Sequence, residues 1–376
     1  MNSAAVISKR RDPRILITGG GTGGHAYPAI AIADAIRQKR PNAAISFAGS
    51  RDKIEWRIVP LAGYPISPIT VQGLQRKITA QNLLMPFRVA KGLRESIQLI
   101  QQFDADVVVG TGGFVALPIL LAARYLVRPI VIQEQNAFMG LTNRLASRFA
   151  DSIHLAFEEA RPKRVKGSVH MNGNPVRADL GNASKSEGRT FFDLDRADKI
   201  ILVFGGSLGS LALNEAMATL VSGLLAISGL GVIWQTGDRY FDSYSESVQK
   251  HPRLKMHKYI DRMDLAQAAA DLAVCRSGAS TCAELMLTGT PSIMVPSPNV
   301  AEDHQTKNAR SIEKQGACEV LPEDQLMAEL LDRVKNLIET TGRLSAMSQK
   351  ALQLARPHAA DRIAEDVLMI AEVQPR

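Results

Sequence analysis

Short runs of apolar, largely β-branched residues alternate along the chain with longer amphipathic stretches. A segment at 26–39 has the pattern of a helix, with Pro28 tolerated in its first turn. Buried strands are predicted on either side of it and further on, at 14–19, 43–49, 106–110, 129–133 and 152–157. This alternation is typical of a parallel sheet with helices on both faces.

The same pattern restarts at residue 199. A strand at 199–206 leads into glycines and then into a helix at 211–227, and further strands are predicted at 231–237, 254–260, 272–278 and 291–296. The stretch 176–199 between the two series is polar and turn-rich, which predicts a linker. We therefore expect two similar α/β domains that face each other across a cleft.

Size and composition agree with a soluble protein of two domains. The 376 residues exceed the usual size of one compact core, and 45% are hydrophobic and 22% charged. The basic N-terminus lacks the apolar stretch of a signal peptide, and no run approaches the roughly 18 apolar residues of a membrane-spanning helix. Cys275, Cys282 and Cys318 have no metal-ligand spacing, which predicts buried, reduced thiols in a reducing cytoplasm.

Positive charge is concentrated in the first half of the chain. Residues 1–175 contain 23 Lys and Arg against 11 Asp and Glu, a net charge of +12, whereas the remainder carries −4. Nucleic acid, an anionic membrane surface or plain solvation of the surface would each account for this excess.

The first glycine loop fits the dinucleotide-binding fingerprint through the spacing Gly19-x-Gly21-x-x-Gly24. A dinucleotide site also needs a carboxylate at the end of the second strand, and this chain has Gly49-Ser50-Arg51 there. The arginine could accept a 2′-phosphate, so an NADP-dependent oxidoreductase remains an alternative.

Glycine-rich turns recur in the second half, at 205–210 and within CRSGASTCAEL at 275–285. Their backbone amides could hold a diphosphate, with Arg276 beside it. Glu284 has two interpretations: a capping-box partner of Thr281, or a carboxylate that binds two ribose hydroxyls. A nucleotide site in one domain opposite a glycine loop in the other suggests group transfer rather than hydride transfer.

Seven motifs occur in the order found in one bacterial family. They are GGGTGGHAYPAIAIA, GTGGFVALP, EQNAFMGLTNRLAS, GNPVR, GGSLGS, CRSGASTCAELMLTGTPSIMVP and HQTKNA, the last at 304–309. On these residues the chain resembles the peptidoglycan N-acetylglucosaminyltransferases that convert lipid I to lipid II, and the match runs from residue 14 to beyond 310.

The resemblance implies a GT-B fold, that is, two Rossmann-like domains separated by a cleft. It implies transfer of N-acetylglucosamine from UDP-N-acetylglucosamine to the 4-hydroxyl of a muramoyl-pentapeptide on undecaprenyl diphosphate, with inversion by a single displacement. Neither cofactor nor metal is expected, and no Asp-x-Asp motif occurs where UDP would bind. The expected domains are 1–176 for the acceptor and 177–355 for the UDP-sugar, with the last helix, 356–376, packed back on the first domain.

Carried over position by position, the resemblance places two sets of residues in the cleft. The donor set would bind diphosphate, uracil, ribose and sugar, and comprises Thr22, Gly23, Gly24, Asn136, Arg177, Ser207, Ile260, Met263, Arg276, Ser280, Glu284, His304, Gln305 and Asn308. The acceptor set would cradle the lipid-linked diphosphate, and comprises Gly21, Thr22, Gly23, Gly24, His25, Gly113, Phe114, Asn136 and Asn143.

His25 and Glu134 are the two expected catalytic residues. A lone histidine at a helix start often only caps or packs, but His25 borders a phosphate loop and its side chain suits uptake of a proton from a sugar hydroxyl. Glu134 is the competing base. The chain departs from the family pattern in three places: Leu208 replaces a common glutamine, Gln133 a frequent histidine and Phe114 a frequent tyrosine.

A lipid-linked acceptor also implies a membrane surface. Residues 74–100 place Leu83, Leu84, Met85 and Phe87 beside Arg76, Lys77, Arg88, Lys91 and Arg94, and 117–128 offers a second apolar patch. With the charge of the first half, this predicts peripheral association with the cytoplasmic face of the bacterial membrane, although a core-facing helix would show the same pattern. Other cell-wall enzymes could be partners, whereas the chain has no nucleic-acid-binding motif.

Three alternatives remain from the sequence. One is another GT-B transferase, such as a diacylglycerol or antibiotic glycosyltransferase, although EQNAFMGLTNR and HQTKNA argue against it. The others are the NADP-dependent oxidoreductase and a non-catalytic nucleotide-binding protein.

Overall fold

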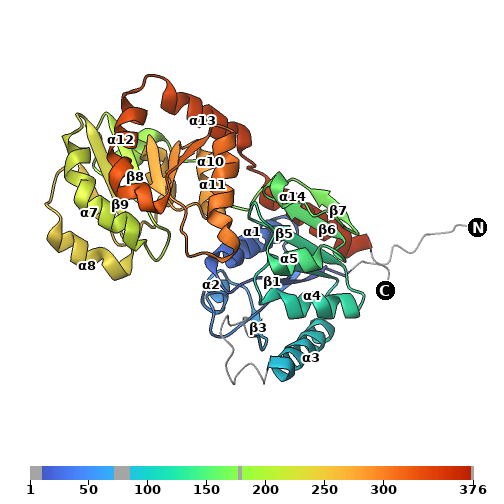
Figure 1. The fold of residues 1–376 in the computed structure, drawn as a ribbon. Helices are drawn as coiled ribbons and strands as arrows, with labels where there is room; N and C mark the ends of the chain where they lie inside the picture. The colour runs from blue at the N-terminus through green and yellow to red at the C-terminus, as the bar shows by residue number, and fades with distance from the viewer. Residues whose placement is uncertain (1–10, 72–84, 177–179, 374–376) are drawn as a thin grey trace, which may run out of the picture.

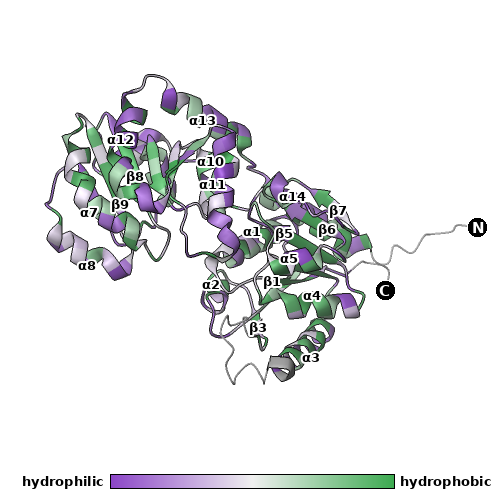
Figure 2. Cartoon of the chain, viewed as in Figure 1, coloured by the Kyte–Doolittle hydropathy of each residue, from purple (hydrophilic) through white to green (hydrophobic). Residues whose placement is uncertain are grey.

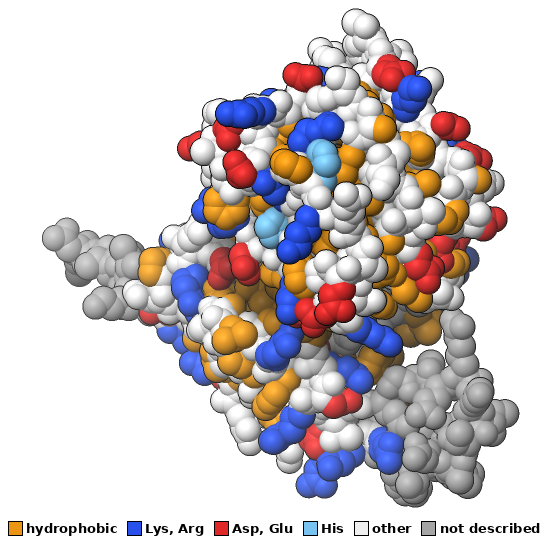
Figure 3. Space-filling model, turned by 90° about the vertical axis from the view of Figure 1, so that its left-hand side faces the viewer, with side chains coloured by type: hydrophobic (Ala, Val, Ile, Leu, Met, Phe, Trp, Pro, Cys, Tyr) orange, Lys and Arg blue, Asp and Glu red, His pale blue; other side chains and the backbone are white. Residues whose placement is uncertain are grey.

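The fold is taken from a computed structural model, which describes residues 11–71, 85–176 and 180–373. The chain forms two α/β domains, each built on its own parallel sheet, which lie one beside the other in Figure 1. In the space-filling view the surface is hollowed between an upper and a lower part of the molecule, and hydrophobic side chains line the hollow (Figure 3).

The first domain contains, among the described residues, a sheet of seven parallel strands in the order β3-β2-β1-β4-β5-β6-β7. Its strands are β1 (Arg14–Thr18), β2 (Ala44–Gly49), β3 (Ile66–Pro68), β4 (Val107–Gly110), β5 (Ile130–Glu134), β6 (Ser152–Leu155) and β7 (Ser168–His170). Its helices are α1 (Gly23–Lys39), α2 (Glu55–Leu61), α3 (Met85–Phe103), α4 (Ala116–Tyr125) and α5 (Leu141–Ala146).

The second domain repeats this topology. Its described part has six parallel strands in the order β10-β9-β8-β11-β12-β13. They are β8 (Lys199–Phe204), β9 (Leu230–Gln235), β10 (Leu254–His257), β11 (Leu272–Cys275), β12 (Ser292–Met294) and β13 (Cys318–Val320). The helices are α6 (Lys185–Phe191), α7 (Leu211–Ala226), α8 (Asp238–Ser247), α9 (Met263–Ala269), α10 (Ala279–Thr288), α11 (His304–Lys314), α12 (Leu326–Glu339) and α13 (Arg343–Leu354).

Successive apolar side chains of each central strand point to opposite faces of the sheet, so a core forms on both faces. Ile15 and Ile17 pack under α1 on one face of the first sheet, whereas Leu16 faces α4 on the other. The central strands therefore carry hydrophobic residues on both faces, as Figure 2 shows for both sheets. Cys275, Cys282 and Cys318 are buried in the second domain, and burial raises the pKa of each thiol, as expected for unreactive thiols.

The last helix, α14 (Ala359–Val373), returns to the first domain and packs against α1. Ile363 and Val367 join the same apolar cluster as Ile15 and Ile17. The two crossings between the domains lie side by side, because a Cβ atom built on Gly173, before the first crossing, would be 2.4 Å from Cβ of Arg356, at the second.

Three details differ from the sequence-based predictions. The segment 176–199 is not wholly a linker, since it contains α6, which begins with a capping box between Ser184 and Glu187 and packs on α9. Helix α1 begins at Gly23, so Pro28 lies beyond its first turn. The strands β3, β7 and β13 were not predicted, because three residues at a sheet edge are too short to show a period.

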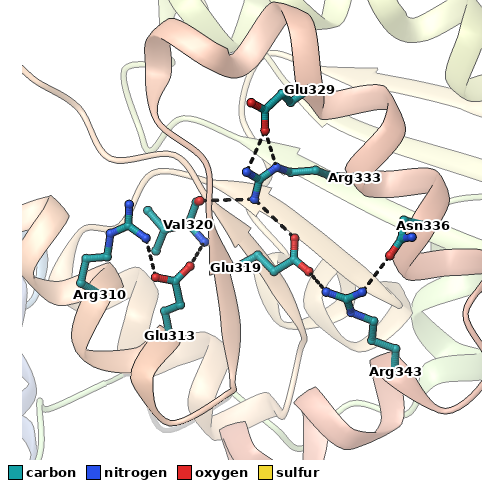
Figure 4. A network of polar contacts seen from close by, with 8 residues as sticks. All are labelled: Arg310, Glu313, Glu319, Val320, Glu329, Arg333, Asn336 and Arg343. Atoms are coloured by element: carbon teal, nitrogen blue, oxygen red, sulfur yellow. Dashed lines mark hydrogen bonds and ion pairs between the residues drawn. The ribbon is translucent and has the colours of Figure 1, made fainter.

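Charged side chains hold the edge strand β13 in place (Figure 4). Arg333 donates to the carbonyl of Val320 at 3.4 Å and lies 3.6 Å from the carboxylate of Glu319. Arg343 pairs with the same carboxylate, while Glu313 accepts the amide hydrogen of Val320 at 2.8 Å. Charges along an edge strand discourage pairing with another chain.

Candidate active site

The three glycine-rich loops lie where the strand order of their sheet reverses. In the first sheet the reversal falls between β1 and β4, and in the second between β8 and β11. Ligands of open α/β sheets bind at the carboxyl ends of the strands at this point. The sequence-predicted loops 19–24, 205–210 and 275–280 all begin at these strand ends.

The first loop is packed backbone against backbone on the loop that follows β4. The amide of Gly20 donates to the carbonyl of Gly112 at 3.4 Å. Gly113 has a φ of 78°, and a Cβ there would lie 2.1 Å from the carbonyl oxygen of Gly20. Only glycine fits at position 113. The close contact between the two loops places Gly113 and Phe114 beside Gly21. Thr22 and Gly24 are exposed at the start of α1.

A carboxylate that the sequence-based prediction missed supports this loop. Glu55, at the start of α2, is 1% exposed and accepts the amide hydrogens of Gly21 at 2.9 Å and of Ser50 at 3.2 Å. The amide of Gly21 is therefore occupied by protein, which leaves the amides of Thr22, Gly23 and Gly24 to meet an anion.

His25 lies in the first turn of α1, where its ring reaches the loop after β4. Its Nδ1 atom is 3.0 Å from the carbonyl oxygen of Thr111 and 3.2 Å from Oε1 of Gln135. The Thr111 hydroxyl donates to the His25 carbonyl at 2.8 Å, so the backbone of the histidine is held as well. None of the described residues forms a hydrogen bond with Nε2, and the side chain is partly exposed.

Glu134, the competing base, is fully engaged in the fold. The carboxylate is 1% exposed and accepts hydrogen bonds from the backbone and side chain of Asn136, at 3.0 and 3.2 Å. It accepts two more, from the amide of Gly140 at 3.1 Å and from Nδ2 of Asn143 at 2.9 Å. A carboxylate with four donors is poorly placed to take a proton from a substrate, and here it orients Asn136 and Asn143.

In the second domain, the guanidinium of Arg276 is bonded to protein groups. It donates to the hydroxyl of Ser210 at 2.7 and 3.1 Å and to the carbonyls of Val295 and Pro296, and it pairs with Glu323. Arg276 thus fixes the end of the second glycine loop, and a direct bond to diphosphate would require some of these contacts to break. Ser207, in the same loop, is exposed.

Gln235 links the second glycine loop to the expected uracil site. Its side chain donates to the carbonyl of Gly206 at 3.0 Å and accepts the amide hydrogen of Ile260 at 2.9 Å. Because the amide of Ile260 is occupied in this way, its carbonyl is the main-chain group that is left to contact the uracil. Met263 lies in the same apolar cluster as Ile260.

Helix α10 excludes one of the two interpretations of Glu284. The helix begins at Ala279 with Gly278 at its N-cap, so Thr281 is not a cap and the capping-box interpretation is wrong. Glu284 lies in the second turn, half-buried, where its Oε2 accepts a hydrogen bond from Gln267 at 3.4 Å. Ser280 lies in the first turn, among the backbone amides that have no partner within a helix.

Asn308 lies between the two domains. It is 0% exposed, and its Oδ1 accepts the amide hydrogen of Ala137 at 2.8 Å. Its Nδ2 donates to Oδ1 of Asn136 at 3.2 Å and to the carbonyl of Ser277 at 3.3 Å. Asn308 therefore connects the loop after β5, in the first domain, to the loop after β11, in the second.

His304 and Gln305 begin the same helix, α11, as Asn308. Oε1 of Gln305 accepts the amide hydrogen of Ser297 at 2.8 Å, and its carbonyl accepts from the Ser277 hydroxyl. Arg177, the remaining donor residue of the prediction, lies outside the described residues.

Comparison with known proteins covers both halves of the chain. Residues 15–155 match the glycosyltransferase family 28 N-terminal domain, and residues 200–363 match its C-terminal domain. The chain belongs to glycosyltransferase family 28. A protein of Salinibacter ruber named UDP-N-acetylglucosamine--N-acetylmuramyl-(pentapeptide) pyrophosphoryl-undecaprenol N-acetylglucosamine transferase is 52% identical, over 96% of this chain and 98% of its own length. A protein of Desulfitobacterium hafniense with the same name is 38% identical, over 93% and 97%.

Solved structures of glycosyltransferases have the same fold. The crystal structure of Acinetobacter baumannii MurG is 29% identical and superposes with a TM-score of 0.76, over 94% of this chain and 99% of that one. A UDP-glucosyltransferase from Polygonum tinctorium shares the fold at 15% identity, with a TM-score of 0.70 over 98% and 100%. The GT-B prediction is confirmed. Membership of a glycosyltransferase family replaces the oxidoreductase alternative.

Within this family 28 site, sequence reasoning missed Glu55, Gln135 and Gln235. Gln135 was within a quoted motif, EQNAFMGLTNRLAS, and could have been found there as a polar residue directly after a buried strand. Gln235 shows the same signal as the last residue of the buried strand β9. Glu55 gave no such signal, because its partner in the glycine loop, Gly21, is 34 residues away. Leu208, one of the departures from the family pattern, is 82% exposed and contributes no polar group at its position.

Proposed function

We propose that the chain transfers N-acetylglucosamine from UDP-N-acetylglucosamine to the 4-hydroxyl of N-acetylmuramoyl-pentapeptide on undecaprenyl diphosphate, with inversion at the anomeric carbon. The first domain, residues 1–176 with 356–376, would hold the acceptor, and residues 177–355 would hold the donor. The observation that carries the proposal is the placement of His25 beside the first glycine loop: its ring is fixed through Nδ1, and none of the described residues bonds to Nε2.

In this reaction, His25 acts as the general base. As the 4-oxygen of the acceptor bonds to the anomeric carbon, the proton of the 4-hydroxyl passes to Nε2 of His25. The bond between the anomeric carbon and the diphosphate oxygen breaks on the opposite side, and UDP leaves with the electron pair. Attack from the side opposite the leaving group inverts the configuration.

Backbone amides at two helix starts stabilise the departing diphosphate. Helices α7 and α10 follow the adjacent strands β8 and β11, so both begin at the switch point of the second sheet. Their N-terminal amides and helix dipoles favour negative charge. Ser207 lies in the loop before α7, and Ser280 lies in the first turn of α10. Arg276 adds a positive charge beside Ser210 while it holds the loop in place. Glu284 takes the ribose hydroxyls in the proposal.

We further propose that the first domain associates with the anionic cytoplasmic face of the bacterial membrane. Helices α3 and α4 pack side by side, and Val89, Leu121, Tyr125 and Val127 are exposed there among basic residues. These basic residues are Lys91, Arg94 and Arg124. None of the described helices is long and apolar enough to cross a membrane. Leu83, Leu84, Arg76, Lys77 and the side chains of Met85 and Phe87 lie outside the described residues.

The proposal is tested by transfer of labelled sugar from UDP-N-acetylglucosamine to lipid I. His25→Gln should lower kcat at least a hundredfold, the lower bound for general-base catalysis, with UDP-N-acetylglucosamine binding nearly unchanged. His170→Gln, which changes a histidine on β7 outside the site, serves as the matched control and should retain activity. Full activity of His25→Gln would contradict the role of the base, and no transfer by the wild-type chain would contradict the function.

Association with the membrane is tested separately, by sedimentation with vesicles of phosphatidylglycerol. Binding should weaken as salt rises, because surface charges are screened. Binding that is absent, or equal with neutral phosphatidylcholine vesicles, would contradict the membrane proposal and leave the transferase proposal intact.

A further inference from the structure

A row of buried amides lies behind His25, outside both predicted residue sets. Gln133 and Gln135 are 0% exposed and Asn174 is 4% exposed. Nε2 of Gln133 donates to Oδ1 of Asn174 at 3.3 Å, and Nε2 of Gln135 donates to Oε1 of Gln133 at 2.5 Å. The other end of Gln135, its Oε1 atom, lies 3.2 Å from Nδ1 of His25.

The orientation of the Gln135 amide follows from its surroundings. Its Nε2 atom is 2.7 Å from the carbonyl oxygen of Thr111, 2.5 Å from Oε1 of Gln133 and 3.4 Å from the carbonyl oxygen of Gln133. An amide end that faces three oxygens must be the nitrogen of Gln135, because the amide oxygen would find no hydrogen-bond donor there. The amide oxygen of Gln135 therefore faces His25.

The side chain of His25 has one consistent tautomer in this setting. Both groups near Nδ1, the Thr111 carbonyl and Oε1 of Gln135, are acceptors only. Nδ1 of neutral His25 must then carry the hydrogen, which leaves the lone pair on Nε2. A free imidazole in water prefers the opposite tautomer, with hydrogen on Nε2, in which the lone pair would point into the protein.

We propose that Gln135, held by Gln133 and Asn174, is a positioning residue that fixes His25 in the Nδ1–H tautomer and so turns its basic lone pair toward the acceptor. The inference rests on the proposed role of His25 as base. It also gives Gln133, where the family pattern often has histidine, a defined task as the link between the Gln135 and Asn174 amides.

The tautomer can be read directly by NMR of the full chain labelled with 15N-histidine. The chain has seven histidines, and the spectrum of His25→Gln identifies the signals of His25 by their loss. The wild-type spectrum at a pH where His25 is neutral should show hydrogen on Nδ1. In Gln135→Met, which removes both polar ends of the amide, a larger fraction should carry hydrogen on Nε2. In the same variant kcat should fall roughly tenfold, the effect of one hydrogen bond, with KM for UDP-N-acetylglucosamine unchanged.

The matched control is Asn214→Leu, which removes a buried amide bonded to Trp234 and Thr236 in the second domain and should leave the His25 signals unchanged. Hydrogen on Nε2 in the wild type would overturn the inference, whether or not Gln135→Met folds. Wild-type signals and wild-type kcat in Gln135→Met would overturn it too. Failure of the proposed function appears instead as no transfer by the wild-type chain, and failure of the base role as a fully active His25→Gln. Both differ from failure of this inference, because the tautomer is read without turnover.

Discussion

Glu55 accepts the amide hydrogen of Gly21 at 2.9 Å from a position where its Cδ would lie 2.3 Å from a Cβ on Gly20. A buried carboxylate thus fills the inner side of the first glycine loop and fixes which amides point outward. The glycine at position 20 is needed for this close approach of the carboxylate, and not for a positive φ.

Glu55→Gln should perturb this loop selectively. The amide replaces one acceptor oxygen by a donor, so either Gly21 or Ser50 loses its partner, and the free energy of unfolding should fall by about 1–3 kcal/mol. We expect a higher KM for lipid I and an unchanged KM for UDP-N-acetylglucosamine, measured in the transfer assay. Glu158→Gln, which changes an exposed carboxylate of the same domain, is the control. An unchanged KM for lipid I would contradict the supporting role of Glu55.

Asn308→Asp should weaken the contact between the domains. The new carboxylate can still accept from Ala137, but its second oxygen would face the oxygens of Asn136 and Ser277, which now accept from Nδ2. We expect a larger radius of gyration by small-angle X-ray scattering and a kcat at least tenfold lower, since two hydrogen bonds are lost. Asn336→Asp, on the exposed side of α12, should change neither quantity. A wild-type scattering curve for Asn308→Asp would show that this side chain does not hold the domains together.

Val127→Asn should separate stability from membrane binding. Val127 is a β-branched residue with a φ of 54°, and its side chain is 75% exposed. Asparagine tolerates this backbone conformation, so the free energy of unfolding should rise by about 1 kcal/mol. Loss of the apolar side chain should weaken sedimentation with phosphatidylglycerol vesicles. Val165→Asn, an exposed valine without a positive φ, should gain no stability. Stronger vesicle binding by Val127→Asn would exclude Val127 from the membrane contact.

His154 should make the stability of the first domain depend on pH. Burial lowers its pKa below the ordinary value of 6.5, despite the hydrogen bond to Asp366 at 2.9 Å. The pKa of Asp366 is lowered too, because the effect of its own burial, which would raise it, is outweighed by its hydrogen bonds to His154 and Ser152. The unfolded chain then binds more protons than the folded chain, so stability is present above pH 6.5 and falls as the pH drops below it. Urea unfolding at pH 8 and pH 6 should show this loss in the wild type and a smaller one in His154→Gln. Equal losses would assign the effect to other groups.

Much of the fold could be predicted, because buried parallel strands are continuous apolar runs. The glycine loops, with their positions at strand ends, were also visible. The partners of those loops were not, since Gly21 meets Glu55 34 residues away and His25 meets Gln135 110 residues away. Such pairs form only when the sheet order brings two loops together. Helix α6 was missed because its sequence is polar and its stability comes from a capping box and from packing on α9.

The adjacency of Gly173 and Arg356 limits how the two domains can move. The chain passes between them twice at nearly the same place, so the least restrained motion is a rotation about an axis through this pair of crossings. In such a rotation the site loops, which lie at the strand ends, would swing while the crossings stay fixed. The open arrangement that admits the lipid acceptor and the closed arrangement for transfer would then differ by a rotation about one hinge. A disulfide across the two crossings should leave both arrangements accessible.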